Sequence, residues 1–353
     1  MCFIGFFLFY YWMLLSLFYT SSQGNSIHKI IYFGTNFAAF FPFFVNSFNI
    51  RRFIQYCTIG VFGLVIWFVP ILLGYEMRIH GIVNEYSKGI IGLYLGLNFI
   101  LGILVCALIT SRELIFNNRA VDCSIAFAGL ICMLLLGGRG PLIFLVLCLL
   151  LYRLSKPVDF KVNLPKSLAY GSLGLIITFV TGKLCWETVT VLAGRTMYRL
   201  SGIYKGFIGG VELLDTSSYE RIDFIYRSLE LIFRDIKNCL IGTGIGSWNF
   251  EIYGVDKRGY PHNIILEIWS ELGIIGVLVF SILLIPLIKK RKLNYKYISI
   301  FVLIYLLLNV LKSSGLEDLR ISFCFAFMFL LSDNELTSAG RKFTMRKSAK
   351  ARH

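Results

Sequence analysis

The sequence contains about ten apolar runs separated by polar connections, and this pattern restricts the fold more than any other feature, because a membrane-spanning helix needs about 20 apolar residues. The first run lacks the basic start and the small-residue cleavage site of a signal peptide, so we interpret it as a retained helix. We predict an all-α polytopic membrane helix bundle. The runs lie at 3–19, 30–48, 53–74, 89–110, 120–136, 141–152, 167–182, 263–288, 297–311 and 320–332.

Composition supports a membrane location. Hydrophobic residues make up 57% of the 353 residues and charged residues 16%, whereas a soluble domain carries about 25% charged residues. The surplus of apolar side chains must face lipid. The formal net charge of +15 could indicate nucleic-acid binding. However, the basic residues lie in short clusters between apolar runs, which is typical of cytoplasmic loops, and we expect no nucleic-acid partner.

The Lys and Arg residues also predict the orientation, because cytoplasmic loops hold most of them. Alternate connections contain Arg51 with Arg52, Arg112 with Arg119, and a basic group at 289–296, whereas the opposite connections hold few basic residues, including Lys29 and Arg139. Both termini are therefore expected in the cytoplasm. Four regions follow: seven spans in 1–182, a periplasmic segment at 183–262, three spans in 263–332, and a basic cytoplasmic tail at 333–353.

The long polar segment 183–262 contains one well-marked amphipathic helix. Ser217 and Glu220 form a capping box at its start, and two pairs four residues apart, Asp223–Arg227 and Glu230–Arg234, can form ion pairs. We expect the helix to lie flat on the bundle or on the lipid interface. Its predicted apolar face consists of Ile222, Ile225, Tyr226, Leu229, Ile232, Phe233 and Ile236.

Two glycine-rich stretches could bring backbone close to a ligand. Gly242, Gly244 and Gly246 alternate with other residues, which can indicate a nucleotide loop, but a tight turn against a ligand or a neighbouring helix fits better because no strand precedes it. The turn around Arg139 is flanked by glycines. Its guanidinium could bind phosphate in a bidentate manner or could reach to lipid head groups.

The stretch from Pro261 to Gly276 carries the strongest catalytic candidates. His262 precedes an apolar run, in which Glu267 and Glu271 follow four residues apart. Carboxylates within a membrane helix are costly against lipid and should face the protein interior or a wet cavity. His262 could act in proton transfer or could simply cap the helix. The histidines lie far apart in sequence, so no metal or other cofactor is expected.

Together these motifs resemble the O-antigen ligase and O-antigen polymerase superfamily, over about residues 120–290. The resemblance rests on Gly-Arg-Gly at 138–140, Ser-Ser-Tyr-Glu-Arg at 217–221, Gly-Thr-Gly at 242–244 and Pro-His-Asn at 261–263. The ligases show His followed by Asn, Ser or Gln, then nine residues, Gly, two residues, and Gly, Thr or Tyr. His262, Asn263, Gly273 and Gly276 match that pattern.

The resemblance implies a glycosyltransferase that acts on an undecaprenyl-diphosphate-linked glycan at the periplasmic face of the inner membrane, with a chain-length regulator as a further partner. It implies His262 as the proton acceptor and Arg139 and Arg221 as diphosphate ligands. Arg195, Arg199, Asn263 and Glu267 are further candidates for substrate contacts or for positioning. The usual ligase has twelve helices, so the shorter chain favours a polymerase. The alternatives are a ligase and a flippase for the same lipid-linked glycan.

The segment 183–262 also holds two cysteines. Cys185 and Cys239 both lie outside the apolar runs, and a disulfide between them is an open alternative to two free thiols.

Overall fold

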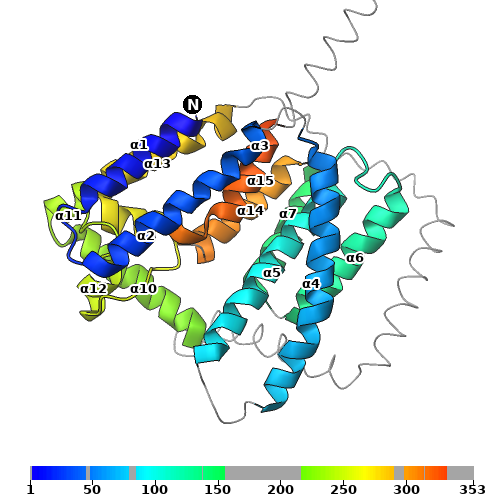
Figure 1. The fold of residues 1–353 in the computed structure, drawn as a ribbon, viewed down its shortest axis with the longest axis horizontal. Helices are drawn as coiled ribbons and strands as arrows, with labels where there is room; N and C mark the ends of the chain where they lie inside the picture. The colour runs from blue at the N-terminus through cyan, green and yellow to red at the C-terminus, as the bar shows by residue number, and fades with distance from the viewer. Residues whose placement is uncertain are drawn as a thin grey trace, which may run out of the picture. The chain divides into compact units, whose positions relative to one another are not determined.

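The computed structural model describes residues 2–44, 48–78, 85–136, 138–155, 216–289, 298–313 and 315–331. The regular structure of these residues is helical (Figure 1), as the sequence predicts. By length and composition, two of the described helices could cross a membrane, at Ile50–Trp67 and Ile264–Leu287. Five shorter apolar helices accompany them, at Phe3–Ser16, Leu95–Thr110, Gly140–Ser155, Ile300–Lys312 and Arg320–Leu330. The apolar helices indicate a membrane protein, while the number of ten spans stays a prediction.

The described helices divide into two units, and each is described by itself. The first unit combines the two ends of the chain with the segment that follows residue 215. It consists of α1 (Cys2–Ser16), α2 (Gln23–Thr35), η1 (Asn36–Phe40), α3 (Phe41–Phe44), α10 (Thr216–Phe233), α11 (Ile236–Ile241), α12 (Trp248–Tyr253), α13 (Ile264–Lys289), η3 (Leu316–Asp318), α15 (Arg320–Leu331) and the end of α14 (Ile300–Ser313).

The core of the first unit is built largely from aromatic rings. Phe6 of α1 stacks on Phe33 of α2 with ring centroids 5.2 Å apart, and Phe40 of η1 stacks on Phe327 of α15 at 4.2 Å. Such pairs contribute about 0.5–1.5 kcal/mol each beyond their buried area. They hold the amino-terminal helices against the carboxy-terminal helix. Large apolar side chains on the outer sides of α1 and α2, including Phe7 and Ile31, stay more than half exposed, as is typical of lipid-facing positions.

The second unit contains α4 (Ile50–Arg78), α5 (Glu85–Thr110), α6 (Arg119–Leu136), α7 (Arg139–Ser155) and the beginning of α14. Its connection between α5 and α6 is fixed by a buried carboxylate. Asp122 accepts hydrogen bonds from the backbone of Ile115 and Phe116, both at 2.9 Å. Arg51 of α4 donates to the carbonyl of Ile115 at 2.8 Å. Arg51, one of the predicted cytoplasmic cations, therefore makes a structural contact.

The predicted span at 30–48 is wrong in its boundaries. Helix α2 begins at Gln23 and ends at Thr35, and the chain continues as the 3-10 turn η1. Asn36 explains part of this change, because its buried amide donates to the carbonyl of Leu316 at 3.2 Å. Buried polar groups are mostly hydrogen-bonded, and the turn at Asn36 directs its amide nitrogen to η3, while its amide oxygen has no hydrogen-bond partner among the described residues. The polar residues before 30 join the helix because the fold buries Asn25, Ser26 and Lys29.

The amphipathic helix predicted after residue 216 is confirmed as α10, and its predicted apolar face is only partly buried. Ser228 and Ile232 are fully buried, whereas Tyr226 and Phe233 are 69% and 62% exposed. Trp248 determines which face of α10 is buried, because its indole packs edge-on against Phe224 and donates to the Ser228 hydroxyl at 2.9 Å. The exposed aromatic side chains leave an apolar strip on α10, which suits a helix lying at a lipid interface.

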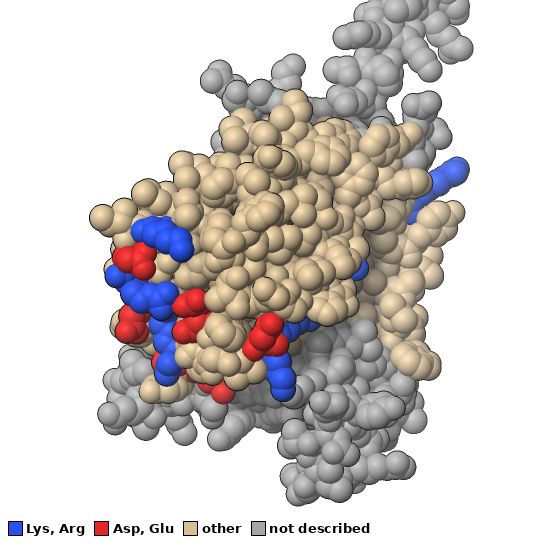
Figure 2. Space-filling view, turned by 60° about the vertical axis from the view of Figure 1, so that its left-hand side comes forward, with Lys and Arg blue, Asp and Glu red and all other residues tan. Residues whose placement is uncertain are grey.

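The ion pairs of α10 are also partly as predicted. Arg227 pairs with Asp223 at 2.7 Å, whereas Arg234 pairs with Glu251 of α12 at 2.9 Å rather than along its own helix. In Figure 2 most of the visible charged side chains gather in the left-hand and lower part of the coloured surface, and the area above them is almost uncharged. An uncharged area of this kind is expected of a protein that contacts lipid.

Candidate active site

His262 occupies the end of the loop 254–263, directly before α13 begins. Its φ of +55° is uncommon for a residue other than glycine. Two aromatic rings surround the imidazole. Tyr260 lies with its ring centroid 4.5 Å away, and Phe224 of α10 stacks on it at 5.9 Å with the rings 19° apart. The ring is half-buried. The unusual backbone conformation therefore places the imidazole against α10.

Arg221 lies one helical turn before Phe224 on α10, so the two residues share a face of that helix. The structure thus places His262 against the helix that carries Arg221, and both are predicted site residues. Arg139 is the first residue of α7, in the second unit, and its relation to His262 stays a prediction. Arg195, Arg199 and Cys185 lie outside the described residues.

Asn263 serves as the cap of α13. Its side-chain oxygen accepts hydrogen bonds from the backbone of Ile265 at 3.0 Å and of Leu266 at 3.1 Å. These are N–H groups that a helix start leaves without intrahelical partners. The cap fixes the point at which α13 begins and therefore the position of His262 just before it. Asn263 was predicted to bind substrate, and the side-chain oxygen that could do so already has this structural role.

A buried ion cluster links α13 to α2. Lys29 contacts Glu267, and it donates to the two carboxylate oxygens of Glu271 at 2.8 and 2.7 Å. The three residues are at most 2% exposed. The prediction that both glutamates face the protein interior is confirmed. Two carboxyl groups facing one ammonium require further donors, and the Leu316 backbone supplies one to Glu267 at 3.0 Å.

Glu271 also accepts hydrogen bonds from the glycine-rich segment 242–246. Its carboxylate accepts from the backbone of Gly246 at 2.9 Å, while its carbonyl accepts from Gly244 at 2.8 Å. The segment packs against helices on several sides, since Ile245 donates to the Ser16 hydroxyl and the Asn25 amide donates to the carbonyl of Gly246. The interpretation as a turn that approaches neighbouring helices, rather than a phosphate loop, is confirmed.

Helix α13 is interrupted at Gly273, where φ is 69° and ψ is −177°. The interruption leaves carbonyls of the preceding turn without partners in the helix. Other groups satisfy them: Thr243 and Gly244 donate to the carbonyls of Ser270 and Glu271, and the Trp12 indole donates to that of Leu272 at 3.1 Å. This geometry gives the glycine at position 273, which the sequence pattern places after His262, a physical reason, since residue 273 adopts a conformation that only glycine favours.

Gly273→Ala should therefore lower the free energy of unfolding more than Gly254→Ala does. Both glycines have positive φ. A methyl group at residue 273 would collide with the backbone carbonyl of Leu240, whereas residue 254 has nothing within 4 Å. We expect the free energy of unfolding to fall by about 1 kcal/mol in Gly254→Ala, from backbone strain alone. The fall should be clearly larger in Gly273→Ala. Thermal unfolding in detergent compares the two, and equal losses would contradict the packing described for Gly273.

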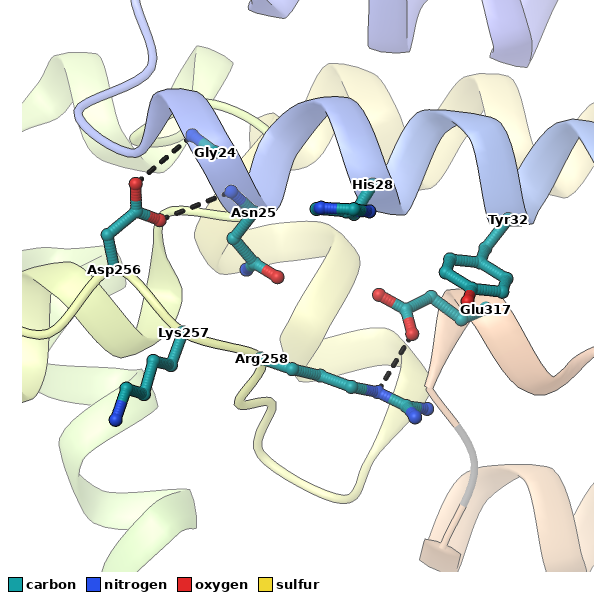
Figure 3. A pocket seen from close by; sticks show the side chains of 8 residues that line it. All are labelled: Gly24, Asn25, His28, Tyr32, Asp256, Lys257, Arg258 and Glu317. Atoms are coloured by element: carbon teal, nitrogen blue, oxygen red, sulfur yellow. Dashed lines mark hydrogen bonds and ion pairs between the residues drawn. The ribbon is translucent and has the colours of Figure 1, made fainter.

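A pocket of about 340 Å³ lies beside this region in the first unit (Figure 3). One wall is the start of α2, with Gly24, Asn25, His28 and Tyr32, and the other walls come from the loop 254–263 and from η3. The residues of those walls are Asp256, Lys257, Arg258 and Glu317. Every side chain that lines the pocket carries a polar group, in contrast to the apolar outer surface of the same unit.

The charged groups of the pocket have fixed partners. Arg258 pairs with Glu317 at 2.8 Å and with Asp318 at 3.1 Å. Burial alone would lower the pKa of Arg258, but the charges of Asp318 and Glu317 outweigh it and raise the pKa, so that the guanidinium stays ionised. The same guanidinium lies 5.9 Å from the ring centroid of Tyr260. Burial raises the pKa of Tyr260 to about 12, so its phenol stays protonated at neutral pH.

Asp256 caps the start of α2. Its carboxylate accepts from the Ser22 hydroxyl and from the backbone of Gly24 at 3.1 Å and of Asn25 at 3.2 Å. These hydrogen bonds, the Ser22 bond first, hold the pKa of Asp256 below its ordinary value. A pKa that folding lowers gives stability that is fully present above the unfolded value of about 3.9 and is lost as the pH falls through the folded value.

We expect Asp256→Asn to reduce the acid sensitivity of the protein for this reason. Between pH 7 and pH 3 the unfolding temperature of the unmodified protein should fall. Protonation of Asp256 contributes to this fall below about pH 4, and that contribution should be absent in the variant. Thermal unfolding across this pH range measures the difference. Parallel curves for the two proteins would show that the Asp256 cap contributes nothing to stability.

Three residues of this region were not singled out from the sequence. Lys29 was counted only among the cations of a short connection, and Phe224 and Tyr260 received no role. One signal for Lys29 was present, because two carboxylates predicted to face the interior need a cation partner. No signal pointed to the two aromatic rings, since their meeting with His262 depends on tertiary packing. Among the described residues, no group of three His, Cys, Asp or Glu side chains could hold a metal ion.

Comparison with known proteins gives one match. Residues 124–281 match the family model described as O-antigen ligase. No curated protein and no solved structure matches the chain. The matched region contains Arg139, Arg221, His262 and both interior glutamates, and it agrees with the region of the resemblance noted in the sequence.

Proposed function

Because the match over residues 124–281 supports membership of the O-antigen ligase and polymerase superfamily, we propose that this protein is a glycosyltransferase that polymerises a lipid-linked surface polysaccharide. The observation that carries the proposal is the placement of His262 on the face of α10, one turn from Arg221, at the polar end of an apolar helix. We propose that a basic residue and a cation of the same unit thereby lie at the level where a membrane lipid presents its head group.

The proposed reaction moves a glycan from undecaprenyl diphosphate to a sugar hydroxyl. The hydroxyl oxygen of the acceptor attacks the anomeric carbon, the bond from that carbon to the diphosphate oxygen breaks, and the diphosphate leaves on its lipid. His262 accepts the proton of the attacking hydroxyl, because a neutral imidazole is a suitable base near neutral pH. Tyr260 and Phe224 restrict the orientation of the ring.

Arg139 and Arg221 are proposed to neutralise the diphosphate as its bond to the sugar breaks. Guanidinium groups bind phosphate in a bidentate manner, and charge stabilisation of this kind is usually a large part of catalysis. Arg195 and Arg199 are proposed as further contacts to the diphosphate or the glycan. Glu267 has a positioning role in this proposal and does not touch the substrate, because its carboxylate contacts Lys29 and the backbone of Leu316.

The distribution of Lys and Arg supports the proposed location. With both termini in the cytoplasm, the segment 183–262 and His262 lie on the periplasmic side of the inner membrane, between seven spans in 1–182 and three in 263–332, and the basic tail 333–353 is cytoplasmic. The lipid-linked glycan is available on that side, and a chain-length regulator is the partner that a polymerase would need there. A ligase is the second candidate, because the family model carries that description.

Reconstitution of the full chain in vesicles with purified lipid-linked repeat units tests the proposal. A ladder of longer lipid-linked glycans identifies a polymerase. Transfer that requires added lipid A-core identifies a ligase and would correct the choice between the two enzymes. Movement of labelled glycan across the bilayer without new glycosidic bonds would show a flippase, and the proposal of a glycosyltransferase would then be wrong.

A further inference from the structure

The pocket between α2 and the loop 254–263 differs chemically from a diphosphate site. Of its charged side chains, Asp256 and Glu317 are anionic and Arg258 is cationic, while the Lys257 ammonium points away from the other lining groups (Figure 3). Two carboxylates and a single guanidinium among the inward-facing groups make the pocket unfavourable for a diphosphate. Arg258 is in addition already paired with Glu317 and Asp318. The ligand of this pocket should therefore be uncharged and rich in hydroxyl groups.

Its lining suits a sugar. His28 and Tyr32 lie one turn apart on α2, and both side chains lie on the side of the helix that faces Arg258 and Glu317 (Figure 3). They supply aromatic surface and polar edge atoms, while the carboxylate and guanidinium groups can accept from and donate to neighbouring hydroxyls. The volume of about 340 Å³ lies at the small end of the usual range for ligand sites. It admits sugar rings and is too small for a polyprenyl chain.

The pocket also lies next to the proposed base. The Arg258 guanidinium is 5.9 Å from the ring centroid of Tyr260, and that ring is 4.5 Å from the ring of His262. One aromatic side chain therefore separates the pocket wall from the imidazole. In the proposed reaction the base takes its proton from the acceptor hydroxyl, so the acceptor sugar is the substrate part that must lie on this side of His262.

We propose that the pocket formed by His28, Tyr32, Asp256, Arg258 and Glu317 binds the acceptor glycan. This proposal rests on the proposed function and adds a substrate subsite to it. The charged pairs of the pocket are already formed, so the acceptor meets a site that needs little rearrangement. The bound glycan then presents its hydroxyl to His262 across the edge of Tyr260, while the diphosphate of the donor stays with the arginines.

The double variant His28→Ala/Tyr32→Ala tests the proposal, because both side chains are exposed and their removal should leave the fold intact. We expect the KM for the acceptor repeat unit to rise about tenfold or more, with kcat changed little, through the loss of two or more ligand hydrogen bonds. The matched control is Ile27→Ala, a 53% exposed position on another side of the same helix. An unchanged KM in the double variant, measured in active protein, would overturn the proposal.

A binding measurement separates this proposal from the proposed function. His262→Ala protein is titrated with the lipid-free oligosaccharide of one repeat unit and with inorganic pyrophosphate, with and without the two α2 substitutions. Oligosaccharide affinity that falls about tenfold with the substitutions supports the pocket, even if the unmodified protein then proves inactive as a transferase. If pyrophosphate affinity falls instead, or neither changes, the pocket does not bind the acceptor glycan.

Discussion

Lys29→Ala is expected to lower the free energy of unfolding by about 3–5 kcal/mol, since removal of one member of a buried ion cluster leaves its partners charged and unpaired. Glu267 and Glu271 are each at most 1% exposed and face the Lys29 ammonium. Without that ammonium the two carboxylates repel each other at the junction of α2, α13 and the segment 242–246. Unfolding in detergent, followed by heat or by denaturant, measures the loss.

Lys237→Ala is the matched control, because Lys237 is an exposed lysine of the same unit whose ammonium lies 6.0 Å from the ring centroid of Tyr19. Its removal should change the stability by about 0.5 kcal/mol or less. A second variant, Lys29→Met with Glu267→Gln and Glu271→Gln, removes all three charges and should recover part of the loss. If Lys29→Ala unfolds at the same temperature as Lys237→Ala, the ion cluster does not hold the two helices together.

His262→Ala is expected to reduce the rate of glycan transfer by about 10²–10⁴-fold, the usual contribution of a general base. Its unfolding temperature should fall much less than that of Lys29→Ala, because the ring is only half-buried and packs against the rings of Tyr260 and Phe224. The assay is the reconstituted transfer of glycan between lipid-linked repeat units, with kcat and KM measured separately. The loss should appear mainly in kcat.

Two further measurements distinguish a base from a structural residue at position 262. Added imidazole should restore part of the rate of His262→Ala but none of the rate of an arginine variant such as Arg221→Ala. His262→Gln keeps hydrogen-bonding atoms at this position without a group that titrates near neutral pH, and it should be as inactive as the alanine variant. Full activity of His262→Gln would exclude the proposed proton transfer.

The interior of this protein was predictable from the sequence where a single residue carries a large energetic cost. Glu267 and Glu271 within an apolar run had to face the protein, and they do. Their need for a cationic partner was predictable, but its identity was not, because Lys29 is 242 residues from Glu271 in the sequence. The glycine pattern at 242–246 indicated close backbone approach, but only the packed structure shows that it fills the space beside the interruption of α13.

Predictions that depended on periodicity alone succeeded less well. The spacing of apolar residues gave the existence of α10 but not its buried face, since Trp248 selects Phe224 and Ser228 rather than Tyr226. Similarly, the apolar run 30–48 did not reveal the change from α2 to η1, which follows from the contact of Asn36 with Leu316. His262 and Arg221 were identified by motif. That His262 packs against the helix carrying Arg221 could not be derived from their spacing in the sequence.

The distance in sequence between Lys29 and its partners also bears on how the chain is assembled. During synthesis Lys29 leaves the ribosome 242 residues before Glu271, and until then no carboxylate of α13 exists to neutralise it. An isolated ammonium is poorly tolerated away from water. The buried position of Lys29 can therefore form only after α13 has been synthesised, so the late helices of the first unit complete the packing of its early ones.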